Sequence, residues 1–150
     1  MDDAQLERQL RDLLEKEKIR ELVKRYCHHQ WDCDGAAMAA LFTEDCEFSS
    51  SVSGVHLVGK PALKKFFGGV GYEASGRPIP YPYTHDHLIE LDGDRATGIC
   101  SLDLRFELNG EVKVHGGRYK DEYRKEGGEW KFRARRIKVV ISGNLPQAPV

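Results

Sequence analysis

The chain has 150 residues, 40% of them hydrophobic and 31% charged, as in an ordinary globular protein. A chain of this length buries roughly two-thirds of its unfolded surface, so we expect residues 1–150 to form one domain without disulfides or a structural metal. The 23 Lys and Arg residues balance 24 Asp and Glu residues to a net charge of −1, which argues against nucleic acid as a partner. Because apolar runs are short and the N-terminus is charged from its second residue, we expect neither a membrane partner nor a secretory signal.

The first predicted element is a long helix from Asp3 to about Gln30. Residues at spacings of three and four form its buried face: Ile19, Leu22, Val23, Tyr26 and Gln30. The narrower leucine stripe of its first part is expected to lie over the domain or on a partner. A short Ala-rich helix follows, which opens at Asp34 and Gly35 and ends at Phe42, with Asp34 as its N-cap.

Two short strands are predicted next, at 46–50 and 55–58. A third helix follows over 62–67, with Pro61 at an early helical position. The segment 68–82 contains four of the 15 glycines and three of the six prolines, which favours a loop.

The second half of the chain has a different pattern, in which three turn signals separate four strand-like runs. Asp92-Gly93, Asn109-Gly110 and residues 125–128 mark the turns. This pattern predicts an antiparallel meander. Helices followed by a meander indicate an α+β domain in which the helices cover one face of a strongly bent sheet.

The cysteines are scattered and form no CxxC pair: Cys27, Cys33, Cys46 and Cys100. We therefore expect reduced, buried or half-buried thiols and a cytoplasmic protein.

Five segments in this order carry a family pattern: Arg25-Tyr26, Ala39–Asp45, His87–Ala96, Gly117–Asp121 and Trp130–Arg136. Together they resemble the SnoaL-like polyketide cyclase family, in the superfamily of scytalone dehydratase, bile-acid 7α-dehydratase and the nuclear-transport-factor-like folds. The resemblance covers about residues 12–142 and leaves a short tail, 143–150. It implies a cystatin-like, cone-shaped α+β barrel, whose curved antiparallel sheet wraps around a ligand cavity closed by the N-terminal helices, and it implies a dimer. It implies less about chemistry, because this fold hosts cyclases, dehydratases, isomerases, hydrolases and non-catalytic subunits.

Alternation along the first meander strand predicts which side chains face the cavity. The odd positions are the more apolar: Tyr83, His85, His87, Ile89 and Leu91. If Asp92-Gly93 is a two-residue turn, Ile89, His87 and His85 lie opposite small residues: Ala96, Gly98 and Cys100. Small neighbours leave room for a ligand beside both histidines.

The last strand allows the same reasoning. One face is largely apolar: Trp130, Phe132, Ala134 and Arg136. The other face is expected to be solvated: Arg133, Arg135 and Lys138. Arg136 is then a buried guanidinium, which needs a carboxylate such as Asp121 or a ligand anion, because it cannot lose its charge. Tyr119 and Asp121 are its expected neighbours on the preceding strand.

The family comparison also predicts a departure from the usual chemistry. Catalytic members typically use a tyrosine in the first helix, an aspartate five residues later and a histidine on the first meander strand. Tyr26 matches the tyrosine, but the aspartate position holds Trp31 and the histidine position falls near Pro82, with His85 and His87 displaced along the strand. Four carboxylates stay open as the partner of the histidine: Asp32, Asp34, Asp103 and Asp121.

Structural roles compete with these assignments. Asp34 would serve as a helix cap, Tyr26 as a core residue, and the two histidines as hydrogen-bonded sheet residues. The His-x-His spacing would suit zinc or iron, but no third ligand is evident, so we predict no metal and no other cofactor.

The leading hypothesis is a small enzyme that uses acid–base chemistry to dehydrate, isomerise or cyclise a hydrophobic cyclic or polyketide-like small molecule. His85 or His87 would be the general base, Tyr26 would donate to a substrate oxygen, and Arg136 would stabilise negative charge. Five residues are expected to bind the substrate: Trp31, Tyr83, Cys100, Tyr119 and Phe132. The alternative is a non-catalytic ligand-binding protein or a structural small subunit of an oxygenase, favoured by the missing acid at Trp31.

The outer face of the meander is expected to remain apolar, which favours a homodimer formed through it. The residues that suggest this are Ile99, Val112, Val114 and Val139.

Overall fold

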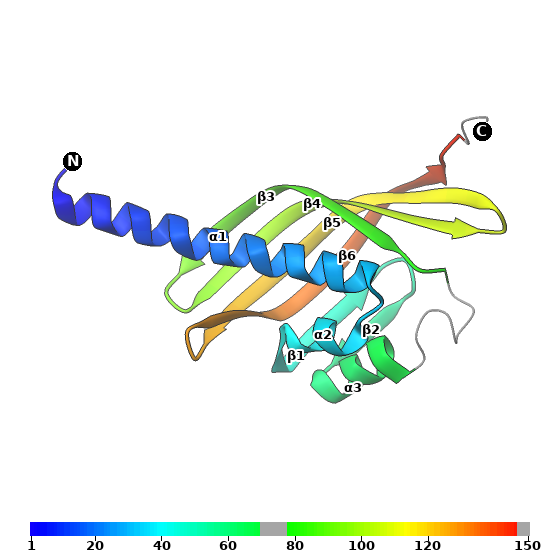
Figure 1. Ribbon diagram of the computed structural model, residues 1–150, viewed down its shortest axis with the longest axis horizontal. Helices are drawn as coiled ribbons and strands as arrows, with labels where there is room; N and C mark the ends of the chain where they lie inside the picture. Colours follow the sequence, from blue (N-terminus) through cyan, green and yellow to red (C-terminus); the bar gives the residue numbers. More distant parts are fainter. Residues whose placement is uncertain (70–77, 147–150) are drawn as a thin grey trace.

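The computed structural model describes residues 1–69 and 78–146. The expected loop 68–82 and the expected tail 143–150 therefore lie partly outside the described residues, at 70–77 and 147–150. Helices lie along one face of a curved, open, six-stranded sheet (Figure 1). This is the α+β class expected from helices followed by a meander.

Helix α1 spans Asp3–Trp31 and starts at a capping box, in which Asp2 and Gln5 exchange hydrogen bonds between side chain and backbone. Its predicted face is buried, as expected. The first part of α1 extends beyond the sheet (Figure 1). Its leucine stripe is exposed: Leu6, Leu10, Leu13 and Leu14. The helix meets the sheet at Glu15, which accepts a hydrogen bond from Trp130 Nε1 at 2.7 Å and pairs with Lys125 at 2.9 Å.

Helix α2 spans Gly35–Ala40, and Asp34 caps it by accepting a hydrogen bond from the Ala37 N–H at 2.9 Å. The helix ends before the expected Phe42, because Phe42 already pairs with Phe132 at the start of strand β1, Phe42–Ser50. Strand β2, Val55–Val58, returns antiparallel to β1.

Helix α3 spans Lys60–Lys64, with Pro61 in its first turn, and continues as a π-helical turn, Lys65–Gly69. Helix α2 packs so closely on this turn that a Cβ at Gly35 would overlap the carbonyl group of Phe67. In the described part of the chain, no helix combines the length and the apolarity needed to cross a bilayer.

The meander consists of four long strands: β3 (Tyr81–Asp92), β4 (Arg95–Leu108), β5 (Glu111–Glu126) and β6 (Glu129–Asn144). Strand order across the sheet is β2-β1-β6-β5-β4-β3. The four meander strands are antiparallel, as predicted, but β1 pairs with β6 in parallel. The sheet is therefore mixed, and it remains open between β2 and β3.

Three bulges interrupt the meander. In β3, two residues, Asp86 and His87, lie opposite the single residue Cys100 of β4. In β6, Arg133 and Val140 are the extra residues relative to β5. An extra residue changes the phase of alternation, so side chains that would point inward beyond the bulge point outward instead.

The turn between β3 and β4 also differs from the prediction by one residue. Asp92 pairs with Arg95, so the turn is formed by Gly93 and Asp94. Ile89 therefore lies opposite Gly98 and not opposite Ala96 as expected.

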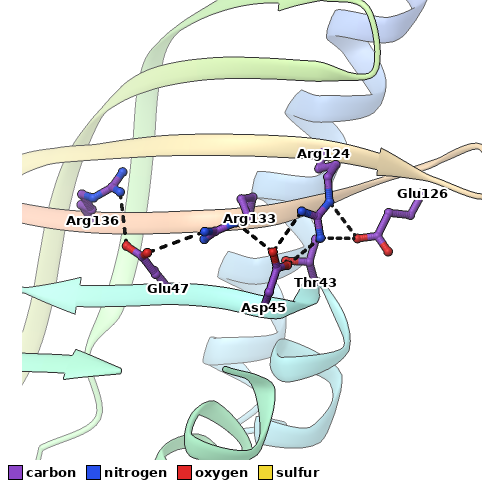
Figure 2. A network of polar contacts seen from close by, with 7 residues as sticks. All are labelled: Thr43, Asp45, Glu47, Arg124, Glu126, Arg133 and Arg136. Atoms are coloured by element: carbon purple, nitrogen blue, oxygen red, sulfur yellow. Dashed lines mark hydrogen bonds and ion pairs between the residues drawn. The ribbon is translucent and has the colours of Figure 1, made fainter. Parts of the chain in front are cut away.

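A network of charged side chains joins β1 to β6 and β5 (Figure 2). Asp45 pairs with Arg124 of β5 and with Arg133 of β6, and Glu47 pairs with Arg133 and Arg136. The hydrogen bonds from Arg124 hold the pKa of Asp45 well below its ordinary value. Exposed pairs of this kind add little energy individually, but together they favour one register of β1 on β6.

Candidate functional site

A cavity of about 210 Å³ lies between the C-terminal part of α1 and the sheet. Most of its wall is apolar and includes Phe48, Phe66, Pro80, Leu104, Phe106 and Ile137. A few polar side chains also line it: Tyr26, Gln30, Ser50, Ser53, His115 and Tyr119. An apolar wall with a small number of polar groups is typical of a small-molecule site.

Two buried tyrosines form the inner end of the cavity. Tyr26 of α1 and Tyr119 of β5 meet edge to face, with ring centroids 6.2 Å apart. Among the described residues, the Tyr119 hydroxyl has no hydrogen-bond partner. Burial raises the pKa of Tyr119 well above its ordinary value, although Arg135 opposes this. Tyr119 therefore stays protonated, and its hydroxyl is a buried hydrogen-bond donor that no described residue uses.

A fully buried cation packs against these rings. The Arg135 guanidinium carbon lies 3.5 Å from the ring centroid of Tyr119, 4.3 Å from that of Tyr26 and 4.5 Å from that of Phe132. Its Nε is 3.2 Å from Asp121 Oδ1, but within the described part of the chain none of its N–H groups is aligned for a hydrogen bond. A guanidinium keeps its charge when buried, so a cation, paired with Asp121, lies behind the tyrosine rings.

The expectation that Arg136 is the buried arginine is wrong. Because Arg133 is the extra residue of a bulge, the alternation of β6 changes phase after Phe132, and Arg135 points inward. Arg136 lies on the outer face, where it pairs with Glu122 at 2.6 Å and with Glu47 at 3.4 Å. Phe132 is buried beneath the Arg135 guanidinium and does not reach the cavity wall.

A buried chain of polar groups leads from Arg135 to His87. Tyr123 donates a hydrogen bond to Asp121 Oδ2 at 2.9 Å, and its oxygen lies 3.1 Å from His87 Nε2. Since the Tyr123 proton is used by Asp121, His87 Nε2 must carry the hydrogen that joins it to Tyr123. Burial raises the pKa of Asp121 to about 6, while burial and the positive charges of Arg135 and Arg20 lower the pKa of His87 to about 4.

Close packing at Gly98 makes the contact of His87 with Tyr123 possible. A Cβ at Gly98 would lie 2.8 Å from the Tyr123 hydroxyl and 2.9 Å from His87 Nε2. His87 therefore faces a small residue inside the sheet, as the alternation predicts. It belongs to this buried chain, however, and does not line the cavity.

His85 does not share the face of His87, contrary to the expectation. The bulge at Asp86, which has a φ of 55°, changes the phase of β3, so Pro82 and Thr84 are turned inward before it and His87 and Ile89 after it. His85 and Tyr83 are exposed. Tyr83 packs against Trp31 on the outside, with Arg105 over its ring at 4.6 Å.

Trp31 stands where the family comparison predicts an aspartate, and Pro82 lies near the position predicted for a histidine. The Trp31 indole Nε1 donates a hydrogen bond to the Pro82 carbonyl oxygen at 3.3 Å, and the indole is exposed. Neither side chain is an acid or a base near neutral pH, so this contact is structural. Trp31 also lies outside the cavity wall.

The cysteines take no part in the cavity wall. Cys100 is fully buried in the core, where burial raises its pKa to about 12. Cys27 and Cys46 are buried too, whereas Cys33 is exposed, contrary to the expectation of four buried or half-buried thiols.

The four candidate carboxylates are now distinguishable. Asp121 is the one that reaches a histidine, through Tyr123. Asp34 caps α2, and Asp32 is the C-cap residue of α1. Asp103 lies on β4, opposite Gly116.

His115 lines the cavity but was not singled out from the sequence. Its Nδ1 lies 2.7 Å from Ser142 Oγ, and its ring packs on Phe106 with centroids 4.9 Å apart. Alternation along β5 carries the signal, because His115 stands an even number of residues before Tyr119 and so shares its face. In the described ranges, no group of three His, Cys, Asp or Glu residues could hold a metal ion.

Known proteins share this architecture. A family model described as a SnoaL-like domain matches residues 11–136. A protein of unknown function from Mycobacterium tuberculosis is 29% identical, with a TM-score of 0.76 over 87% of this chain and 74% of its own. A provisionally named scytalone dehydratase from Novosphingobium aromaticivorans is 22% identical, with a TM-score of 0.76 over 91% of each chain.

A third solved structure, an NTF2-like protein with a cystatin-like fold from Novosphingobium aromaticivorans, is 24% identical, with a TM-score of 0.76 over 93% of this chain and 90% of its own. No curated protein matches the sequence. The family model spans most of α1, the shorter helices and the sheet down to Arg136, so the chain belongs to the SnoaL-like family and has its cystatin-like α+β fold.

Proposed function

We propose that this protein binds a hydrophobic cyclic small molecule in the cavity and transfers protons on it without an organic cofactor, in a dehydration, isomerisation or cyclisation. The observation that carries the proposal is Tyr119, which lines an apolar cavity and whose buried hydroxyl lacks a partner among the described residues. These reactions share an enol or enolate, whose oxygen needs a hydrogen-bond donor in a dry site.

The charge of Arg135 supports this chemistry. A guanidinium stacked on both tyrosine rings favours negative charge on a phenol or on an oxygen bound to it. In the proposed reaction, Tyr119 donates a hydrogen bond to the substrate oxygen, the proton on carbon passes to a water molecule that enters the cavity with the substrate, and Tyr26 packs beside Tyr119. Arg135 takes the role that the sequence suggested for Arg136, and it acts through the rings.

Enolisation of 2-tetralone in deuterated water tests the proposal. The enzyme should accelerate exchange of the α-protons, followed by NMR, because enolate formation needs only a proton acceptor and a donor to the oxygen. Tyr119→Phe should slow the exchange by roughly 100-fold, the usual cost of losing one oxyanion donor. Tyr83→Phe, on the outer face, is the matched control and should leave the rate unchanged.

A non-catalytic ligand-binding role is the second candidate, and the contact of Trp31 with Pro82 favours it. The same experiment separates the two functions. Binding of 2-tetralone that depends on Tyr119 but brings no faster exchange would support the binding protein. Absence of both binding and exchange would contradict both functions for this class of ligand.

A further inference from the structure

The cavity has a second polar group, His115, far along β5 from Tyr119. Both side chains line the cavity, and they stand four residues apart on one strand. Residues four apart on a strand share a face, with their Cα atoms about 13 Å from each other. The two groups therefore cannot contact the same atom of a small ligand, and they define two separate polar ends.

Neighbouring strands hold the His115 ring in place. Phe106 of β4 packs on one side of it, with an angle of 45° between the ring planes, and Ser142 of β6 holds Nδ1. Among the described residues, Nε2 has no hydrogen-bond partner, so it can serve a ligand. Burial lowers the pKa of His115 below its ordinary value, which keeps the imidazole neutral near pH 7 and suited to a hydroxyl or carbonyl.

The surface between the two ends is apolar. Leu104 lies opposite His115 on β4, and Ile137 lies opposite Tyr119 on β6. Both line the cavity together with Phe48 and Phe66. A ligand that reaches from one polar end to the other must therefore have an apolar body.

We propose that the ligand is an elongated molecule of fused or linked rings with an oxygen at each end, and that His115 recognises the outer oxygen while Tyr119 binds the inner one. This inference rests on the ligand site of the proposed function and holds for either candidate function. His115 is thus a specificity residue, which distinguishes ligands with two oxygens from those with one.

Calorimetric titration with 4-hydroxybiphenyl and 4,4′-dihydroxybiphenyl tests the inference, because the second compound adds one hydroxyl at the far end of the same body. The wild-type protein should bind the dihydroxy compound several-fold to about tenfold more tightly, the range expected of one net hydrogen bond. His115→Phe should remove this preference, so that the two compounds bind with equal affinity. His115→Gln, which keeps a donor and an acceptor, should restore part of it.

Other outcomes separate this inference from the proposed function. Equal affinities in the wild type, or a preference that survives in His115→Phe, would overturn the role of His115 and leave the Tyr119 site standing. If 4-hydroxybiphenyl does not bind, or binds equally well to Tyr119→Phe, the proposed site itself is wrong and the inference falls with it. Circular dichroism of each variant confirms that the fold is intact.

Discussion

Arg135 and Arg136 are adjacent in the sequence, yet one guanidinium is fully buried and the other is half exposed. Removing the buried one leaves Asp121 uncompensated, so Arg135→Met should destabilise the protein by about 3–5 kcal/mol. Arg136→Met loses only exposed ion pairs and should cost about 0–1 kcal/mol. Urea unfolding measures both. Similar losses of stability in the two variants would show that the assignment of the two faces is wrong. The double variant Arg135→Met, Asp121→Leu should recover part of the stability lost in Arg135→Met.

His87 should make the stability of the fold depend on pH. Its pKa of about 4 in the folded protein lies below the ordinary 6.5, so the unfolded chain takes up the proton first as the pH falls. The contribution of neutral His87 is therefore complete above pH 6.5 and is lost as the pH falls towards 4. Asp121, whose pKa is raised to about 6, acts in the opposite direction in the same range.

A comparison of the wild type with His87→Gln isolates the histidine, because Asp121 is present in both proteins. Urea unfolding at pH 7 and pH 4.5 should show a smaller loss of stability on acidification in the variant. A loss equal to that of the wild type would contradict the lowered pKa of His87 and its contact with Tyr123 in the folded protein.

Among the secondary-structure elements, strand β3 depends on the bulge at Asp86, a non-glycine residue in the left-handed region. Asp86→Gly should leave stability unchanged or raise it slightly, whereas Asp86→Val should cost about 1–2 kcal/mol, because a β-branched residue is strained there. Thermal unfolding gives the difference. Equal stability of the two variants would argue that the bulge is absent in solution.

Local patterns predicted the elements, and long-range pairing decided which side chains face inward. Spacing along α1 identified its buried face, since that signal lies within the helix itself. The bulges at Asp86 and Arg133 arise from pairing between strands, so strict alternation assigned His85 and Arg136 to the interior instead of Pro82 and Arg135. His87 was placed inside correctly because it lies on the far side of its bulge.

The parallel pairing of β1 with β6 could not be predicted for the same reason. Its partners are far apart in the chain, and nothing local to Phe42–Ser50 indicates the direction of the neighbouring strand. The cavity wall depends on this pairing, since β1 contributes Phe48 and Ser50 to it. Alternation placed the cavity beside His85 and His87, neither of which lines it, whereas family resemblance, which describes the whole chain at once, implied a cavity closed by the N-terminal helices.

For the whole molecule, we expect a homodimer formed through the outer face of the meander. Leu88 and Ile99 pair on that face and are 75% and 40% exposed, which leaves apolar surface uncovered in a single chain. Sedimentation at tens of micromolar should give twice the mass of one chain, and Leu88→Lys with Ile99→Lys should give the monomer. Leu10→Lys, on the exposed stripe of α1, is the control. If that change alone dissociates the dimer, α1 and not the sheet is the interface.

The bulge at Asp86 also has an evolutionary consequence. Loss of that single codon would restore strict alternation in β3 and exchange the inward and outward residues on one side of the deletion, while the other strands kept their sequences. A histidine now in solvent could enter the interior in one mutational step, without any amino-acid substitution. Single-residue insertions and deletions in the strands of such sheets thus offer a short route to new interior chemistry. For the same reason, positions matched in an alignment of relatives need not face the same side of the sheet.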